Sequence, residues 1–308
     1  MDFALIGFGL GVGVLVGMTG IGGGSLMTPM LILVFGVMPT TAIGTDLAYA
    51  AVTKTVGGYK HWKQRTVDFT LSSWMAIGSV PAAILGVCVL TLLEDWLGGD
   101  FEDVVIALLA GALLLTGIAT LIRAFLKRMH ERERDTIEME RRHKVAAVLL
   151  GLSVGFVLGV TSAGSGALIA VGLILLFRLS PRRVVGTDVF HAAILLWAAA
   201  LAHLVAGNVD FALAGTLLVG SVPGVWLGSH WSVRMPVPAL RTVLGVVLVG
   251  AGLGLATKAG IPVPAPVLAA VPVIIAVAAL GPWLGERRSE RRAREALAAD
   301  GRSRPEPV

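Results

Sequence analysis

Two aspartates lie within long apolar stretches of the sequence, where a charged side chain is costly and often marks an ion or proton path. Asp46 and Asp188 each follow a threonine, Thr45 and Thr187 respectively, and each pair comes shortly after a proline. The helix dipole favours an acid in the first turn, which would explain either aspartate without any function. Because the Thr-Asp pair recurs, we expect both pairs to hold protons or coordinate a cation.

Lys54 lies about two helical turns after Asp46 in the same apolar stretch. Two interpretations stay open: the lysine reaches the membrane surface or pairs with Asp46, or its charge binds an anionic solute. His191 follows Asp188 by three residues, so the two side chains share a helix face and can relay protons near neutral pH. A histidine that is simply hydrogen-bonded inside a helical bundle is the alternative.

The other polar residues of these stretches have simpler explanations. Asp68 and Asp210 each precede an apolar run, so we expect both to be helix N-caps. His61 and His203 lie near the ends of apolar runs, which predicts positions at the membrane surface. Cys88 is the single cysteine; it excludes an intrachain disulfide, and we expect it to be a buried small side chain.

Two stretches of small residues, Gly20–Ser25 and Ser162–Gly166, each open a short apolar segment. No strand precedes the glycines and no Walker lysine follows, so neither a dinucleotide fold nor P-loop ATP hydrolysis is expected. An unwound stretch at the start of a helix offers N–H groups and the positive dipole end to an anion; close helix packing is the alternative. The predicted solute contacts, besides Lys54, are Thr19, Gly22, Gly23, Gly24, Ser25, Thr161, Ser162, Gly164, Ser165 and Gly166.

Long apolar runs carry all of these residues. Of the 308 residues, 56% are hydrophobic and 15% charged, whereas a soluble domain has about 25% charged residues. A bilayer core takes roughly 20 apolar residues per helix, so the sequence predicts an all-α integral membrane protein. The runs are 3–19, 42–59, 70–93, 103–122, 145–160, 184–206, 211–230, 242–257 and 265–284, with two shorter ones at 25–37 and 167–178.

The sequence matches itself at an offset of 142 residues. Without any gap, 30 of the 78 positions in 9–86 are identical to their counterparts in 151–228. Internal repeats of this kind are typical of transporter folds. If every run crosses the membrane, each half has five spans, so the two repeats are inverted and one further helix follows. Matching motifs are Gly44-Thr45-Asp46 with Gly186-Thr187-Asp188, Val67-Asp68-Phe69 with Val209-Asp210-Phe211, and Gly78-Ser79-Val80-Pro81 with Gly220-Ser221-Val222-Pro223.

The basic residues predict the orientation. In this topology only Lys258 of the 25 lysines and arginines falls outside the cell, and only Lys54 lies within a span, which agrees with the positive-inside rule. The N-terminus is then outside and the C-terminus is cytoplasmic; re-entrant short runs would instead place the basic tail outside. The basic segments that share the cytoplasmic side are 60–65, 123–144, 178–183, 234–241 and 287–304.

The order of several motifs resembles the sulfite exporter TauE/SafE family, also called the toluene-sulfonate uptake permease family. The motifs are Gly20-Ile21-Gly22-Gly23-Gly24, Pro29, Pro39, Gly44-Thr45 and Val67-Asp68-Phe69. The resemblance covers about 3–257. It implies a bacterial inner-membrane permease with two repeated halves, and it implies sulfite, a sulfonate or a similar anion as the solute.

We therefore expect a secondary transporter that moves a small anion, such as sulfite or an organosulfonate, across the bacterial inner membrane with the proton gradient. A passive anion channel and a membrane scaffold without transport are the alternatives. The sequence has none of the usual enzyme motifs, so we expect no enzyme activity, no cofactor and no metal site. Lipid and a small anion are the expected partners, and nucleic acid is not. The substrate, the direction of transport, the coupling ion and the oligomeric state stay open.

From the apolar runs, the repeat and the basic segments, we expect the chain to have five parts. They are a first transmembrane repeat (1–123), a charged cytoplasmic linker (124–144), a second transmembrane repeat (145–257), a final transmembrane helix (258–285) and a basic cytoplasmic tail (286–308).

Overall fold

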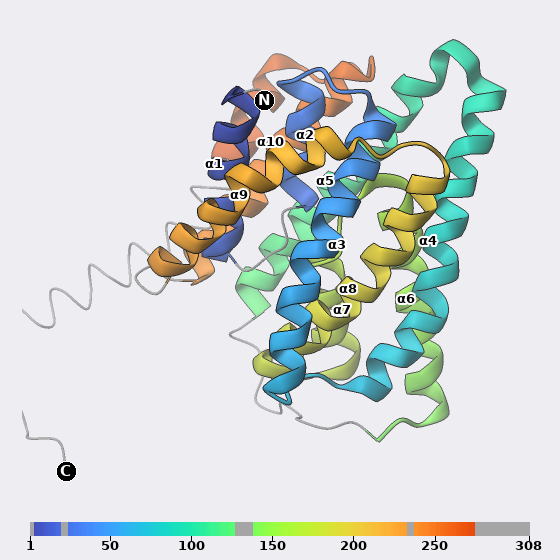
Figure 1. Cartoon of the computed structure of the whole chain (residues 1–308), viewed down its shortest axis with the longest axis vertical. Helices are drawn as coiled ribbons and strands as arrows, with labels where there is room; N and C mark the ends of the chain where they lie inside the picture. Colours follow the sequence, from blue (N-terminus) through green and yellow to red (C-terminus); the bar gives the residue numbers. More distant parts are fainter. Residues whose placement is uncertain (1–2, 20–23, 127–137, 233–236, 275–308) are drawn as a thin grey trace, which may run out of the picture.

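The computed structural model describes residues 3–19, 24–126, 138–232 and 237–274, and it confirms the predicted all-α class (Figure 1). The short 3₁₀ turn Gly98–Asp100 joins α4 to α5, and a further helix covers Ala265–Ile274. The helices are α1 (Phe3–Thr19), α2 (Gly24–Leu33), α3 (Pro39–Lys63), α4 (Phe69–Leu97), α5 (Phe101–Leu126), α6 (Arg141–Thr161), α7 (Leu168–Phe177), α8 (Pro181–Val205), α9 (Phe211–Ser232) and α10 (Val237–Lys258).

Five helical stretches of the described chain are long and apolar enough to cross a membrane. The 25-residue helix α3 is not one of them, because polar residues such as Asp46 and Lys54 interrupt its apolar sequence. α2 and α7 have 10 residues each, about 15 Å at 1.5 Å per residue, and are shorter than the roughly 30 Å bilayer core. The five stretches are Phe69–Arg123, which includes α4 and α5, Arg141–Thr161, Pro181–Val205, Phe211–Gly228 and Leu240–Lys258.

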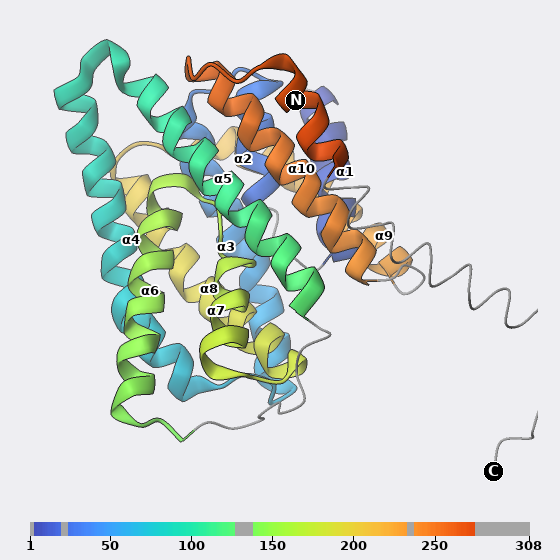
Figure 2. The ribbon, with the colours of Figure 1, turned by 180° about the vertical axis from the view of Figure 1, so that it is seen from behind.

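The helices pack in pairs that join the two halves of the sequence. α1 lies along α9, α4 along α6, α5 along α10, and α3 along α8. In both views α4 and α6 form one flank, α1, α9 and α10 gather on the other, and α3 and α8 lie between them (Figures 1 and 2). The first half of α3, which carries Asp46, is therefore buried, whereas Val52 and Val56 in its second half are exposed.

Glycines allow two of these pairs to approach at backbone distance. Along α6, a Cβ atom on Gly151 or Gly155 would overlap the backbone of α4. Along α1, a Cβ atom on Gly9 or Gly13 would overlap the backbone of α9 in the same way. These glycines are 142 residues apart in the sequence, and so are the α4 and α9 residues that they contact. Small residues at such crossings are typical of membrane helix packing.

Aspartates cap α4 and α9, which confirms the N-cap prediction. The Asp68 carboxylate accepts a hydrogen bond from the Leu71 backbone N–H at 3.0 Å, and Asp210 accepts one from Leu213 at 2.9 Å. Each cap satisfies a backbone donor that the first turn of the helix leaves free. Pro39 and Pro181 begin α3 and α8, where proline's fixed φ fits the helix and its missing N–H is not needed.

Two expectations about individual residues are wrong. Cys88 is exposed on α4 rather than buried. His203 is fully buried rather than interfacial, and its Nε2 lies 2.9 Å from the Gly159 carbonyl oxygen. Arg123, the first residue of the basic segment 123–144 that was predicted to be cytoplasmic, lies in the last turn of α5 and is 6% exposed. In a membrane protein lipid-facing and core positions are both apolar, so sequence alone does not separate them.

Candidate solute-binding and coupling site

The chain between α6 and α7 is unwound and buried. Ser162 has a left-handed backbone with φ +59, and Gly164 has φ +106, a conformation that favours glycine. Ser162 and Ser165 are buried although they belong to no helix. The break therefore brings polar groups into the apolar bundle, as the sequence analysis predicted for this stretch.

The matching stretch between α1 and α2 is only partly described. Gly22 and Gly23 lie outside the described residues, as do Gly20 and Ile21. Thr19 ends α1 and Gly24 begins α2, and Ser25 is buried in the first turn of α2. The contacts predicted for Thr19, Gly22 and Gly23 stay predictions.

Asp46 lies at the centre of a buried polar triangle. Its Oδ2 accepts a hydrogen bond from the Thr28 hydroxyl at 2.6 Å and one from the Ser162 hydroxyl at 3.0 Å. The two hydroxyl oxygens are themselves 2.7 Å apart. Asp46 Oδ1 is buried and has no hydrogen-bond partner among the described residues. The triangle joins α2, α3 and the α6–α7 break.

The first-turn explanation for the two aspartates is wrong. α3 begins at Pro39 and α8 at Pro181, and neither helix has an acid in its first turn. Both carboxylates therefore lie deeper along their helices, beyond the strongest part of the dipole field. Asp46 is 0% exposed and Asp188 is 4% exposed, so both are buried acids that need another explanation.

Two cationic side chains lie near Asp188. The charges of Lys54 on α3 and Arg123 on α5 both interact with its carboxylate. Lys54 is 7% exposed, and the charge of Asp188 acts on it, while the suggested pairing with Asp46 stays a prediction. Arg123 Nη1 also donates to the Gly166 carbonyl at 2.9 Å, which links this cluster to the α6–α7 break.

A third cation lies beside this cluster. Arg241 near the start of α10 is close enough to Arg123 for their charges to interact. Its Nε is buried and has no hydrogen-bond partner among the described residues. Two like charges next to each other and one unpartnered donor are unfavourable in an apolar interior, so an anion would stabilise this arrangement.

Thr45 and Thr187 hold the halves of the molecule together. The Thr187 hydroxyl accepts a hydrogen bond from the Asp68 backbone N–H at 2.9 Å. The Thr45 hydroxyl accepts one from the Asp210 backbone N–H at 3.0 Å. Thr187 therefore binds the residue before α4, and Thr45 binds the residue before α9. A role for either threonine in ion coupling stays a prediction.

His191 is fully buried, and its described hydrogen-bond partner is Ser79. Its Nε2 lies 3.2 Å from the Ser79 hydroxyl, whereas Nδ1 has no partner among the described residues. This geometry fits the simpler explanation of a histidine hydrogen-bonded within the bundle. The proposed relay with Asp188 stays a prediction.

Three residues of these clusters were not predicted from the sequence. Thr28 faces Asp46, but its counterpart in the second half is Ala170, so the repeat gave no signal. Arg123 and Arg241 were counted only in the basic segments 123–144 and 234–241, which were predicted to be cytoplasmic. Only the packing of α10 on α5, and the contact of Arg123 with the α6–α7 break, bring their charges to the site.

An apolar bundle with interrupted helices and charges in its interior is typical of membrane transporters. The chain belongs to the sulfite exporter TauE/SafE family, whose profile matches residues 5–255. It is a multi-pass membrane transporter of that family rather than an enzyme, as predicted.

Relatives in bacteria carry the same general description. The chain is 39% identical over 255 residues to "Probable membrane transporter protein YjnA" of Bacillus subtilis, which covers 83% of this chain and 100% of the relative. It is 30% identical over 247 residues to "Probable membrane transporter protein YdhB" of the same organism, covering 79% and 95%. No solved structure matches the chain significantly.

Proposed function

We propose that this protein is a secondary transporter that carries a small anion, such as sulfite or an organosulfonate, across the bacterial inner membrane together with protons. The observation that carries the proposal is the buried cluster of Lys54, Arg123 and Asp188 at the α6–α7 break. Its two cations and one carboxylate leave an excess of positive charge inside an apolar bundle, and a bound anion neutralises that excess.

The types of the cationic residues suit an oxyanion. A guanidinium offers several N–H donors in one plane, and it matches the oxygens of a carboxylate, sulfonate or phosphate well. Lys54 adds a compact charge, and the break contributes the hydroxyl of Ser165 and backbone groups around Gly164 and Gly166. Asp188 holds the two cations in place when the anion has left.

Asp46 is the proton site of this proposal. The Thr28–Asp46–Ser162 triangle has three short oxygen contacts, but its two hydroxyls supply only two hydrogens. A proton on Asp46 supplies the third: the protonated acid donates to one of the two hydroxyls and accepts from the other, so that each oxygen donates once and accepts once. Ser162 of the proton site and Gly166 of the anion site lie four residues apart in the same break. A change in the protonation of Asp46 is therefore transmitted along this segment to the anion site.

The two halves, 1–123 and 145–257, are inverted repeats in this proposal, and solute crosses as one half rocks against the other. Three observations support the inversion. α1 packs on α9 as α6 packs on α4, the two Asp caps bind the two threonines reciprocally, and α3 and α8 end at opposite ends of the molecule (Figure 1). The linker 124–144, the final helix 258–285 and the tail 286–308 complete the proposed organisation, with the N-terminus outside and the tail in the cytoplasm.

Flux into proteoliposomes tests the function. Purified protein is reconstituted and offered sulfite, small sulfonates and small carboxylates, with and without a pH gradient. The proposal predicts uptake of at least one of these anions, and uptake that is faster with the gradient than without it. An uptake rate that does not depend on the proton gradient would indicate a passive channel. If no anion is taken up, the protein is a membrane scaffold without transport activity.

The Asp46→Asn variant tests whether proton coupling can be lost while the protein still folds. The amide keeps the size of the protonated acid and still donates a hydrogen bond within the triangle, so the protein is expected to fold with normal thermal stability. Acceleration of uptake by the pH gradient is expected to disappear. The matched control is Asp100→Asn, which removes an exposed acid at the α4–α5 turn and is expected to keep the acceleration.

A further inference from the structure

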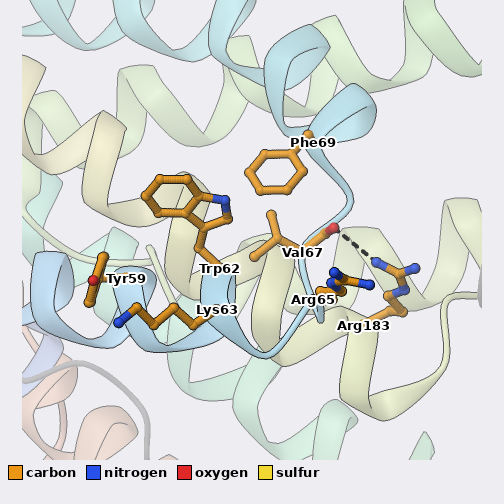
Figure 3. Close-up of a pocket in the computed structure, with 7 residues that line it drawn as sticks. All are labelled: Tyr59, Trp62, Lys63, Arg65, Val67, Phe69 and Arg183. Carbon is orange, nitrogen blue, oxygen red and sulfur yellow. Dashed lines mark hydrogen bonds between the residues drawn. The ribbon is translucent and has the colours of Figure 1, made fainter.

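A basic pocket lies where α3 ends, α4 begins and α8 begins (Figure 3). Its volume is about 540 Å³. α4 and α8 are both membrane-spanning candidates that start here, at Phe69 and Pro181, so the pocket is at the level where spans meet the lipid headgroups. Its position is distinct from the buried clusters around Asp46 and Asp188.

The residues that line the pocket combine bases with aromatic rings. The described residues that line it include Lys63, Arg65 and Arg183 and no acid; the neighbouring Asp68 uses its carboxylate to cap α4. Arg183 is held by its hydrogen bond to the Val67 carbonyl at 2.9 Å, and Lys63 lies 4.8 Å from the centre of the Tyr59 ring. Figure 3 shows the arginines on the α8 side of the pocket and the indole of Trp62 opposite them.

The second half of the chain has a matching pocket without these bases. A pocket of about 250 Å³ is lined by Leu201, Leu204, Val209 and Phe211, which are 142 residues beyond Tyr59, Trp62, Val67 and Phe69. At the counterparts of the three basic residues the sequence has Val205, Gly207 and Thr41. The fold therefore forms this kind of pocket without cations, and the charges of the first pocket need a separate explanation.

The backbone at Arg65 supports the same conclusion. Arg65 has φ +54, in the left-handed region that favours glycine, and its counterpart Gly207 has φ +76. An arginine in this conformation costs about 1 kcal/mol more than a glycine. Both residues follow the C-cap of a helix, α3 or α8, where glycine is the usual residue, so the fold requires the conformation and does not require the arginine.

We propose that this pocket binds the phosphate headgroup of an anionic membrane phospholipid. Basic side chains next to a span attract anionic lipids, and Tyr and Trp rings at the ends of membrane helices pack at the headgroup level. The lipid phosphate lies between Lys63, Arg65 and Arg183, and its glycerol and upper acyl chains lie against the exposed rings of Trp62 and Phe69. The bound lipid ties the α3–α4 loop to the start of α8.

Native mass spectrometry of the full-length protein, purified in detergent, tests this site. We expect one phosphatidylglycerol to bind per chain in preference to phosphatidylcholine. The test variant is Lys63→Val with Arg65→Gly, which copies the second half and fits the backbone at both positions. Because each basic residue near an anionic lipid contributes about fivefold in affinity, we expect phosphatidylglycerol to bind about 25-fold more weakly.

The control variant is Arg141→Gln with Arg142→Gln, which removes two exposed charges on α6, outside the pocket. It is expected to bind phosphatidylglycerol as the wild type does. Equal losses in both variants, or no preference for the anionic lipid, would overturn the proposal. Displacement of the lipid by millimolar inorganic phosphate would also overturn it, because the pocket would then be a site for a soluble anion. If the test variant unfolds at a lower temperature, Lys63→Gln with Arg65→Asn replaces it, since asparagine tolerates the same backbone conformation.

Discussion

Lys54 has its charge at a position where the second half has Leu196, so the helix pair α3–α8 does not need a lysine to pack. Lys54→Leu removes one of the two cations beside Asp188. A hydrogen bond that involves a charge is worth about 1.5–3 kcal/mol, so we expect anion uptake at low concentration to fall roughly 10- to 100-fold. The measurement is initial uptake in proteoliposomes as a function of anion concentration.

Lys60→Leu is the control for this prediction, because Lys60 is an exposed residue on the same helix. It is expected to leave uptake unchanged. If Lys54→Leu transports as well as the wild type, the cluster around Asp188 is not the anion site.

Thr28 provides a test of the triangle around Asp46. Thr28→Val keeps the shape of the side chain but removes the hydroxyl that donates to Asp46 Oδ2. Loss of a partner for a buried polar group costs about 1–3 kcal/mol, so we expect a lower temperature of thermal unfolding in detergent. Thr28→Ser keeps the hydroxyl and is expected to unfold near the wild-type temperature; equal behaviour of the two variants would contradict the proposed triangle.

Single residues were predictable where their type was unusual for their surroundings. Asp46, Asp188 and Lys54 stood out because charges are rare in apolar runs. Thr28 did not stand out, because a threonine is not unusual in a membrane helix and its counterpart in the second half is an alanine. Arg123 lay at the edge of a charged segment, so only the length of α5 and its packing revealed that the side chain is buried.

At the scale of the helices, close packing depends on glycines that face a neighbouring backbone. Gly155→Ala would place a methyl group against the backbone of Ser79 on α4. Because the obstacle is backbone rather than a flexible side chain, we expect a loss of about 1–3 kcal/mol. Thermal unfolding of the detergent-solubilised protein measures the change.

Gly111→Ala is the matched control, since a Cβ atom at Gly111 on α5 meets nothing within 4 Å. Alanine is also the better helix former by about 1 kcal/mol, so this variant is expected to be as stable as the wild type or slightly more stable. A Gly155→Ala variant with the same stability as Gly111→Ala would show that α4 and α6 do not pack this closely.

The order and type of the helices could be predicted from the sequence, whereas their lateral packing could not. Apolar runs, the prolines of α3 and α8, and the capping aspartates predicted where most helices begin. Nothing in the runs predicted that α1 packs on α9 rather than on its sequence neighbours, because that choice depends on which small-residue faces meet. The boundaries of α5 and α6 also extend into the segment 124–144, which was predicted to be a linker outside the membrane spans.

At the scale of the whole molecule, the basic residues gather where the structure joins two distant segments. Arg183 binds the Val67 carbonyl, and the Arg182 guanidinium lies 3.5 Å from the Gln64 carbonyl oxygen. The α3–α4 loop and the start of α8 therefore share one end of the bundle, as the charge distribution predicted. The corresponding loop after α8 lies at the other end (Figure 1).

The central claim is that the two halves face opposite ways across the membrane, so that their broken helices meet in its interior. Labelling with a membrane-impermeant maleimide tests it at two matched exposed positions, Gln64→Cys and Ala206→Cys, in a Cys88→Ala background. On intact cells we predict that Ala206→Cys reacts at once and that Gln64→Cys reacts only after the membrane is permeabilised. Reaction of both positions from the same side would contradict the inverted arrangement and remove the shared interior site with it.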